Sequence, residues 1–434
     1  MPARSHPGGE DPGALGFPGG AGALSHLRVL DLSRVLAGPW ATQVLADLGA
    51  EVIKVERPGT GDESRAWGPP FLRDARGEET GESAYFLSAN RGKKSIAVDL
   101  SRPEGQAIVR RLAQRADVLV ENFKVGALDR LGLGFAALSA ANPRLVYCSI
   151  SGFGQTGPYR DRAGYDFLVQ GMGGLMSVTG EPDGAPGGGP MKVGVAVADV
   201  LTGMYAATAV LAALAWRDRT GRGQRVDLSL LDVQVATLAN QAQSALVTGR
   251  PPARMGNAHP SIVPYQAFAA MDGHLVLAVG NDAQFARFCE VAGLPELARD
   301  PRFATNAARV RNREDLVARL APVLSARPAG DWIRALEAAG VPCGPINDLA
   351  QVFDDPQVRA RGMRVEVPHP LAGAVPLVAS PLRLSDTPPR HGTPPLLGQH
   401  TREVLIEALG MDPAEVEALR ERGVVGVAPA KEDA

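Results

Sequence analysis

The chain has 434 residues, of which 45% are apolar and 21% are charged, a balance typical of proteins that bury a core. This composition excludes disorder of the whole chain and, with the length, predicts two or three domains. The formal net charge is −2, so no global field is expected to attract nucleic acid or an anionic membrane, and any bound anion must be held by local groups.

Strand-like and helical segments alternate over the first 150 residues. LRVLDLS (27–33) and EVIKVE (51–56) are short apolar runs that predict strands, and the pattern at 40–48 between them predicts a helix. Strand, helix and strand within this distance indicate a parallel βαβ unit. The pattern repeats with strands at 95–100, 117–123 and 144–153 and a helix at 103–116. We therefore expect an open parallel α/β sheet with ligands beyond the carboxyl ends of its strands.

The second half of the chain differs in its composition and in its pattern of predicted elements. Glycine-rich turns follow Gly157, and two long helices are predicted at 199–216 and 230–247. Strand-like runs at 265–269 and 274–279 flank AMDG, which predicts a hairpin. Further helices are expected at 283–291, 313–324, 401–409 and 413–421. These segments predict a second, smaller α/β domain, and no internal repeat is visible.

Cysteine usage and hydropathy bear on the cellular environment. Cys148, Cys289 and Cys343 are far apart and form no CxxC pair, which favours neither disulfides nor a zinc site and fits a reducing cytoplasm. The apolar run 204–216 is shorter than the roughly 18 to 20 residues of a membrane span, so no membrane partner is expected. The first 24 residues lack a signal pattern and are expected to be a flexible tail.

Standard catalytic signatures are missing, and the seven histidines are scattered, so no metal site is expected. Polar residues instead follow the predicted strands. Arg57, Lys124 and Arg130 could jointly hold a phosphorylated ligand in one crevice, and Phe123 could stack on an adenine. For each of these residues, a solvated surface position is the alternative.

Asp199 is an acid that enters an otherwise apolar helix. It could cap the helix or favour its dipole, or it could act as a nucleophile. The two roles can coexist, because a helix amino terminus is expected to lower the pKa of a carboxylate and keep it ionised. Tyr165 and Asp166, near another helix start, could be a packed ring and a cap or could contact a ligand.

Several stretches in one order resemble the class III CoA-transferases, the family of formyl-CoA and carnitinyl-CoA transferases. The resemblance runs from about residue 27 to 425. It rests on VLDLSRVLAGPWATQVLADLGAEVIKVERPGTGDESR, ANRGKKSIAVDLSRPEG, ADVLVENFKVGALDRLG, ADVLTGMYAATAVLAALAWRDRTGRGQRVDLSLLD, GVPCGPIN and PLLGQHT. It implies that Asp199 is the covalent nucleophile.

The resemblance also implies a set of CoA contacts and a mechanism. The implied contacts are Leu36, Ala37, Arg57, Val98, Asp99, Leu100, Ser101, Asn122, Phe123, Lys124, Arg130, Ala163, Gly164, Tyr165 and Asp166. The implied reaction is double displacement through an aspartyl mixed anhydride and an aspartyl-CoA thioester. A CoA thioester is then a substrate, a free carboxylic acid is the second substrate, and no tightly bound cofactor is expected.

The implied fold is an interlocked homodimer with a Rossmann-like large domain and a small domain. We expect a tail at 1–24, the large domain at 25–230 and 349–425, a linker helix at 231–254, the small domain at 255–322, a linker at 323–348 and a tail at 426–434.

One loop and two alternatives complete these expectations. Where formyl-CoA transferases carry a run of glycines, this chain has GNAHPSIVPY, so Gly256, Asn257 and His259 are expected to form an acyl-site loop. The loop is similar to that of the succinyl-CoA-dependent branch, which uses dicarboxylates. The first alternative is an α-methylacyl-CoA racemase, which needs a histidine where this chain has Tyr165, and a phenol ionises only near about pH 10. The second is a non-catalytic acyl-CoA binding protein.

Overall fold

The computed structural model describes residues 22–428, and these form two compact units. The first unit is built from the residues up to Gly173, from Val195–Thr237 and from Arg361 onward. The second is built from Gly174–Gly194 and Leu238–Ala360. The tails predicted at residues 1–24 and 426–434 fall largely outside the described residues.

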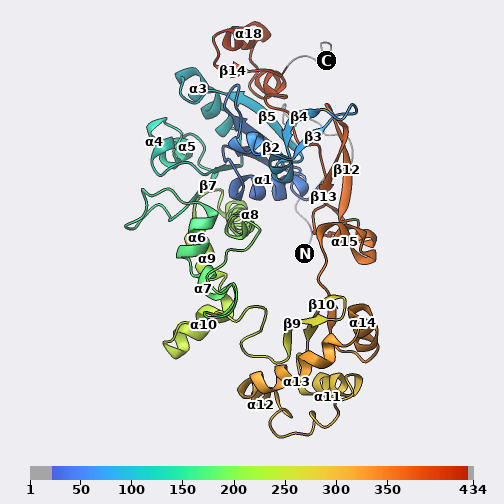
Figure 1. The fold of residues 1–434 in the computed structure, drawn as a ribbon. Coiled ribbons are helices and arrows are strands. Elements are labelled where there is room, and N and C mark those ends of the chain that lie inside the picture. The colour runs from blue at the N-terminus through green and yellow to red at the C-terminus, as the bar shows by residue number, and fades with distance from the viewer. Residues whose placement is uncertain (1–21, 429–434) are drawn as a thin grey trace, which may run out of the picture. The chain divides into compact units, whose positions relative to one another are not determined.

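A seven-stranded sheet is the centre of the first unit (Figure 1). Its order is β14-β5-β2-β1-β6-β7-β8, and all neighbours are parallel except β14, which runs antiparallel to β5. The strands are β1 (Arg28–Asp31), β2 (Glu51–Glu56), β5 (Lys93–Val98), β6 (Val118–Glu121), β7 (Val146–Ser151), β8 (Arg225–Ser229) and β14 (Val425–Gly426). The predicted parallel α/β sheet is thus confirmed. Chain order reverses between β1 and β6, which is the place where ligands bind in sheets of this type.

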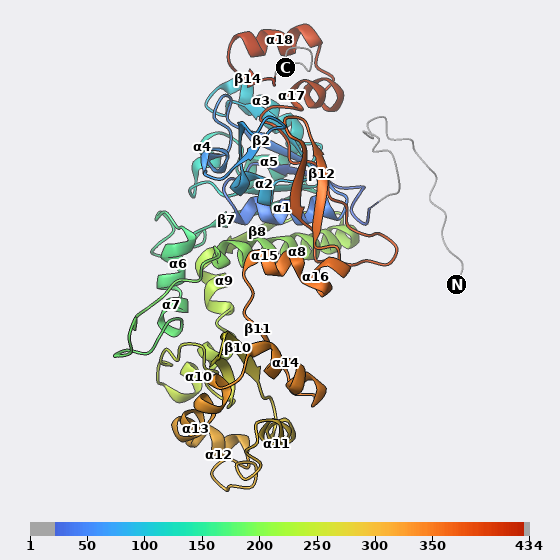
Figure 2. The same cartoon turned by 45° about the vertical axis from the view of Figure 1, so that its right-hand side comes forward.

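Helices cover both faces of this sheet, because its strands are apolar on both sides. The neighbouring residues Val29 and Leu30 of β1 point into two different cores. One core is closed by α3 (Pro103–Ala113), η2 (Val404–Ala408) and α18 (Pro413–Glu421). The other is closed by α1 (Ala37–Asp47) and α8 (Val197–Thr220), which lie side by side in both views (Figures 1 and 2).

Shorter elements complete the first unit. They are η1 (Glu63–Ala66), β3 (Phe71–Arg73), β4 (Glu79–Ser83), α2 (Ala84–Ala89), α4 (Ala127–Arg130), α5 (Phe135–Ala141), α6 (Asp166–Met172), α9 (Leu230–Ala236), β12 (Arg364–His369), β13 (Gly373–Val378) and α17 (Thr401–Glu403). The first helix begins at Ala37 rather than at the predicted Trp40, since Pro39 is tolerated in a first turn.

The second unit contains an antiparallel sheet of order β11-β10-β9 with its own apolar core. Its elements are α7 (Leu175–Val178), α10 (Ala239–Thr248), β9 (Tyr265–Ala270), β10 (Gly273–Ala278), α11 (Asp282–Val291), α12 (Asn306–Arg311), α13 (Arg313–Ser325), α14 (Ala329–Ala338), β11 (Cys343–Pro345), α15 (Leu349–Asp354) and α16 (Pro356–Ala360). The predicted hairpin is confirmed as β9 and β10. The single helix predicted at 230–247 is wrong, because α9 ends at Ala236 and α10 begins at Ala239.

By length and composition, α8 is apolar enough to span a membrane. The sequence-based estimate missed this because it counted only the uninterrupted run at 204–216. A core helix has the same composition, and α8 buries Ala198, Ala206 and Val210 among other side chains. Packing against α1 and the sheet accounts for part of its apolar character, while Tyr205 and Trp216 on the same helix are exposed.

Candidate active site

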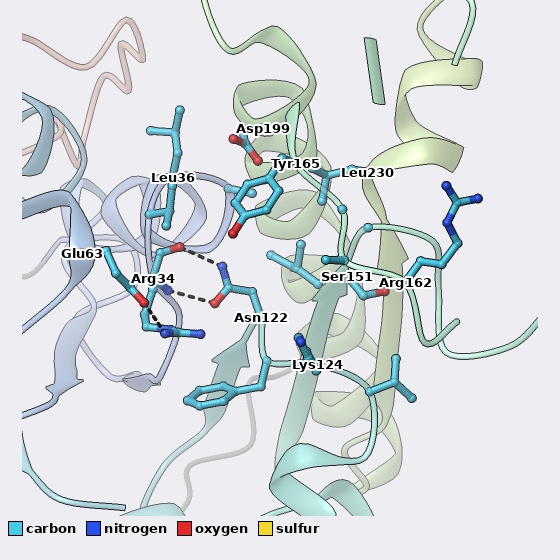
Figure 3. Close-up of a pocket in the computed structure, with 18 of the residues that line it drawn as sticks. Arg34, Leu36, Glu63, Asn122, Lys124, Ser151, Arg162, Tyr165, Asp199 and Leu230 are labelled. Carbon is cyan, nitrogen blue, oxygen red and sulfur yellow. Dashed lines mark hydrogen bonds and ion pairs between the residues drawn. The ribbon is translucent and has the colours of Figure 1, made fainter. Parts of the chain in front are cut away.

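A cavity of about 240 Å³ opens at the carboxyl ends of β1, β6 and β7, where the strand order reverses. The turn after β1, the segment after β6, the segment after β7 and the start of α8 all contribute to its wall. The predicted site residues that line it are Leu36, Ala37, Asn122, Phe123, Lys124, Ala163, Gly164, Tyr165 and Asp199. Figure 3 shows Asp199, Tyr165 and Leu36 around the same opening.

A second cavity, of about 730 Å³, lies at the ends of β2 and β5. Its lining includes the other predicted strand-end residues, Arg57 and the segment Val98–Ser101. Phe123 and Trp67 line both cavities, so one extended ligand could occupy the two together.

Two predicted residues lie elsewhere. Arg130 ends the short helix α4 and lines neither cavity. Asp166 also lines neither, because its carboxylate is used at the start of α8. The predicted contacts are thus divided between the two cavities, and Arg130 and Asp166 line neither of them.

Asp199 sits in the first turn of α8 and is partly buried. The Oδ1 atom of Asp166 accepts hydrogen bonds from the backbone N–H groups of Ala198 and Asp199, at 2.8 and 3.3 Å. Asp166 also accepts a bond from the side chain of Gln170 at 2.7 Å. Two of the N–H groups at this helix start are thus bound by Asp166, and Asp199 lies in the wall of the cavity.

Burial, and next the carboxylate of Asp166, raise the pKa of Asp199 to about 7 from an ordinary value of 3.8. The expectation that the helix amino terminus lowers this pKa is wrong. The pKa is raised because removal from water penalises the charged form, and because the helix N–H groups that would favour the anion already bind Asp166.

Tyr85 on α2 is a neighbour of this carboxylate that the sequence did not single out. Burial, followed by the carboxylates of Asp199 and Asp166, raises its pKa to about 12, so its hydroxyl remains a hydrogen-bond donor. The Tyr85 ring packs edge-on against Trp67, with centroids 5.0 Å apart, and Trp67 lines both cavities.

Arg34 is a second residue that the sequence reasoning missed. Its N–H donates to Oδ1 of Asn122 at 2.9 Å, and its carbonyl accepts from Nδ2 of Asn122 at 2.7 Å, which ties together the loops after β1 and β6 (Figure 3). Its guanidinium pairs with Glu63 and lies 5.0 Å from the centre of the Phe123 ring. Its place directly after a central strand was a signal that could have found it. Arg160 and Arg162, which also line the first cavity, lie in a loop with no such signal.

The predicted acyl-site loop lies in the second unit. His259 donates its N–H to the carbonyl of Tyr265 at 3.0 Å, and its Nδ1 accepts the N–H of Ser261 at 3.1 Å. The guanidinium of Arg313 donates to the carbonyl of His259 at 2.7 Å. Gly256 adopts a φ of 56° beside Glu181. The loop is thus held by side chains of its own unit, and its contact with an acyl group stays a prediction.

The chain is similar to several known proteins. A family model described as CoA-transferase family III matches residues 24–401. A succinate–glutarate CoA-transferase from Agrobacterium fabrum is 52% identical over 88% of this chain and 95% of its own length. A succinyl-CoA:glutarate CoA-transferase from Mus musculus is 47% identical over 93% of this chain and 90% of its own.

A solved structure shows the same fold. The crystal structure of a CAIB/BAIF family protein from Brucella suis superposes with a TM-score of 0.79 at 49% identity, covering 89% of this chain and 99% of that one. The family resemblance drawn from the sequence is thereby confirmed. The chain belongs to CoA-transferase family III and is an enzyme of the CoA-transferase type.

Proposed function

We propose that this chain transfers CoA from succinyl-CoA, or a similar acyl-CoA, to a free dicarboxylate such as glutarate, with Asp199 as the covalent nucleophile. The observation that carries the proposal is the carboxylate of Asp199 in the wall of the cavity at the strand ends. The substrate names of the two relatives support the choice of a dicarboxylate acceptor.

The first half of the reaction makes an enzyme-bound CoA thioester. An oxygen of Asp199 attacks the thioester carbonyl, the carbon–sulfur bond breaks, and a mixed anhydride forms while CoA leaves as a thiolate. The thiolate then attacks the aspartyl carbonyl, which releases the donor acid as a carboxylate and leaves CoA on Asp199.

The second half is the reverse sequence with a different acid. The acceptor carboxylate attacks the aspartyl thioester, giving a new anhydride and free thiolate, and the thiolate attacks the acceptor's acyl carbon. Asp199 is regenerated, and charge and atoms balance with no net proton. Water must be excluded while the anhydride exists, and the partial burial of Asp199 serves this purpose.

The raised pKa of Asp199 suits this chemistry. At a value of about 7, roughly half of the free enzyme is ionised at neutral pH, and a more basic carboxylate is a stronger nucleophile than an ordinary one. The Tyr85 hydroxyl, which stays protonated, could donate to an oxygen that becomes negative nearby.

Cations are distributed to hold the anionic parts of both substrates. Arg57 lines the larger cavity, and Lys124, Arg160 and Arg162 line the smaller one. Guanidinium groups bind phosphates and carboxylates through paired hydrogen bonds, so these positions fit the phosphates of CoA and the free carboxylates of the acids. In the acyl-site loop, Nδ1 of His259 accepts a hydrogen bond from the N–H of Ser261, so Nε2 is the ring nitrogen that would donate to a substrate carboxylate.

We further propose a homodimer of the interlocked kind implied by the resemblance. Large apolar side chains are exposed along α6 and α8 of the first unit, including Phe167 at 59%, Tyr205 at 45% and Trp216 at 47%. Exposure of this kind marks a protein interface. The molar mass measured by light scattering is expected to be twice that of one chain.

The decisive experiment incubates the protein with pairs of acyl-CoAs and free acids and follows new thioesters by mass spectrometry. Succinyl-CoA with glutarate should yield glutaryl-CoA and succinate. When hydroxylamine is added together with the acyl-CoA donor alone, the side chain of Asp199 should be converted to a hydroxamate. The change in mass of the peptide that contains Asp199 detects this product.

The matched control is Asp232, which holds the same third position in the first turn of α9 but lines neither cavity. Asp199→Ala should abolish exchange and labelling, and Asp232→Ala should leave both unchanged. Full exchange by Asp199→Ala would exclude the proposed nucleophile. If deuterium from the solvent enters the α-carbon of the acyl-CoA and no CoA is exchanged between acids, the protein is a racemase instead.

A further inference from the structure

The turn between β1 and α1 contains a backbone conformation that valine rarely adopts. Val35 has a φ of 69°, in the left-handed region, where a branched side chain crowds the backbone. The two residues that follow, Leu36 and Ala37, line the same cavity as Asp199. Residues in such conformations persist only where the surrounding structure holds them there.

A buried ion pair holds this turn from both sides. The N–H of Val35 donates to both carboxylate oxygens of Asp62, at 3.1 and 3.2 Å. Nζ of Lys54 donates to Asp62 at 2.9 Å and to the carbonyl of Ser33 at 2.8 Å. The side chains of Lys54 and Asp62 are both 0% exposed. The pair therefore fixes the backbone immediately before Arg34 and immediately after it.

Stability alone does not explain this pair. Removing two charges from water costs about as much as their attraction returns, so buried ion pairs add little net stability. Although burial opposes ionisation, Lys54 keeps the pKa of Asp62 below its ordinary value, and Asp62 helps to raise the pKa of Lys54. Both groups thus stay charged at neutral pH, and their contribution is geometric.

The turn is coupled to Asp199 through close packing of two helices. Gly203 lies one turn after Asp199 on α8, and a Cβ placed there would be 2.7 Å from the carbonyl oxygen of Ala37. The backbone at the start of α1 therefore rests directly on α8 beside the reacting carboxylate.

We propose that Lys54 and Asp62 are positioning residues, which hold Val35 in its left-handed conformation and so keep the first turn of α1 in place against Asp199. This inference rests on the proposed function, since it assigns the turn a part in the transfer reaction. Lys54 and Asp62 belong to the wall of the larger cavity, but both side chains are fully buried, so the ion pair acts through the turn.

The test is a pair of nearly isosteric substitutions. Asp62→Asn removes the charge that holds the turn. Asp47→Asn removes a comparable buried ion pair, with Arg91, at the other end of α1. For Asp62→Asn we expect kcat to fall about 100-fold with a much smaller change in KM for the acyl-CoA, the loss expected when reacting groups move by about 1 Å. For Asp47→Asn we expect kcat to change less than about threefold, because distant contacts act independently.

The substitution Val35→Gly distinguishes a positioning role of the ion pair from a purely structural one. Glycine adopts the left-handed conformation without penalty, so it no longer needs to be held there. In a Val35→Gly background, Asp62→Asn should lower kcat by only about tenfold or less, measured as a double-mutant cycle. Should Asp62→Asn fail to fold, Lys54→Met combined with Asp62→Asn leaves no unpaired charge and should show the same loss of kcat.

Hydrogen exchange provides a reading that needs no substrate. Backbone amides of residues 34–38 should exchange faster in Asp62→Asn than in the unaltered chain, and not in Asp47→Asn. Unchanged kcat and exchange in Asp62→Asn, an equal loss in Asp47→Asn, or no rescue by Val35→Gly would each overturn the inference. Absence of CoA transfer by the unaltered chain would contradict the proposed function instead, and the amide exchange would still decide the positioning role.

Discussion

Replacing Asp199 by asparagine should stabilise the protein above neutral pH while it abolishes CoA transfer. The pKa of this carboxyl group lies at about 7 in the folded protein, against an ordinary value of 3.8. The difference of about three units corresponds to about 4 kcal/mol that disfavours the ionised form in the fold. An amide of nearly the same shape escapes this cost.

The sign of the pH dependence follows from proton binding. Between pH 3.8 and about 7, the folded state keeps a proton on Asp199 while the unfolded chain has lost it. The contribution of this group to stability therefore falls as pH rises through that window. Compared with the unaltered chain, Asp199→Asn should gain about 2 to 3 kcal/mol more at pH 8 than at pH 5.

Urea unfolding followed by circular dichroism at the two pH values measures this gain. Asp232→Asn serves as the control, since Asp232 is an exposed acid in the same helical position of α9. It should show no difference that depends on pH. An Asp199→Asn protein that is no more stable at pH 8, or equally stabilised at both pH values, would refute the assignment of a destabilised carboxylate.

Three further outcomes follow from the site. Asp166→Asn keeps an acceptor for the N–H groups of α8 but removes the neighbouring charge. The acid limb of kcat/KM against pH should therefore move to a lower pH than in the unaltered enzyme. If the limb does not move, burial alone raises the pKa of Asp199. Gly203→Ala should lower the free energy of unfolding by about 1 to 3 kcal/mol in chemical denaturation and lower kcat, because its methyl group meets the carbonyl of Ala37. Arg57→Met should raise KM for the acyl-CoA about 10- to 100-fold with little effect on kcat, whereas Arg130→Met, which alters neither cavity wall, should leave KM unchanged; equal effects in steady-state assays would contradict the assignment of the two cavities.

The central strands could be predicted from the sequence because each is a short apolar run that is buried on both faces. β8 was missed, since Arg225 and Asp227 interrupt its apolar residues and its outer side is exposed at the edge of the sheet. β14 has only two residues and forms by pairing with β5, more than 300 residues earlier in the chain. A local pattern cannot show such pairing.

The division of the helix predicted at 230–247 has a similar cause. No proline or glycine interrupts that segment, and its helical propensity is continuous. The hydroxyl of Thr237 instead donates to the carbonyls of Val233 and Gln234, and Ala239 adopts a φ of 46°. The break coincides with the passage from the first unit to the second, which is a property of the tertiary structure.

Much of the site was predictable, because parallel strands bring their carboxyl ends to one edge. This rule predicted that Phe123 shares a crevice with Arg57, and both line the larger cavity. Leu36 and Ala37 were implied only by the family resemblance. The ion pair beneath them was not predicted, although a lysine within the apolar run EVIKVE was a signal. Lys54 alternates with the core residues Ile53 and Val55, and a buried ammonium group requires an acid near it.

The direction of the pKa shift of Asp199 could not be predicted from its local sequence. An acid in the first turn of a helix is expected to be stabilised as an anion by the N–H groups there. In this fold those groups bind Asp166, which lies 33 residues earlier in the chain. Asp166 thus accepts the hydrogen bonds of the helix N–H groups, whereas Asp199 is partly buried and is repelled by the charge of Asp166. Only a tertiary contact can assign the two carboxylates to these opposite environments, and the difference between them raises the basicity of Asp199, on which its proposed role as a nucleophile depends.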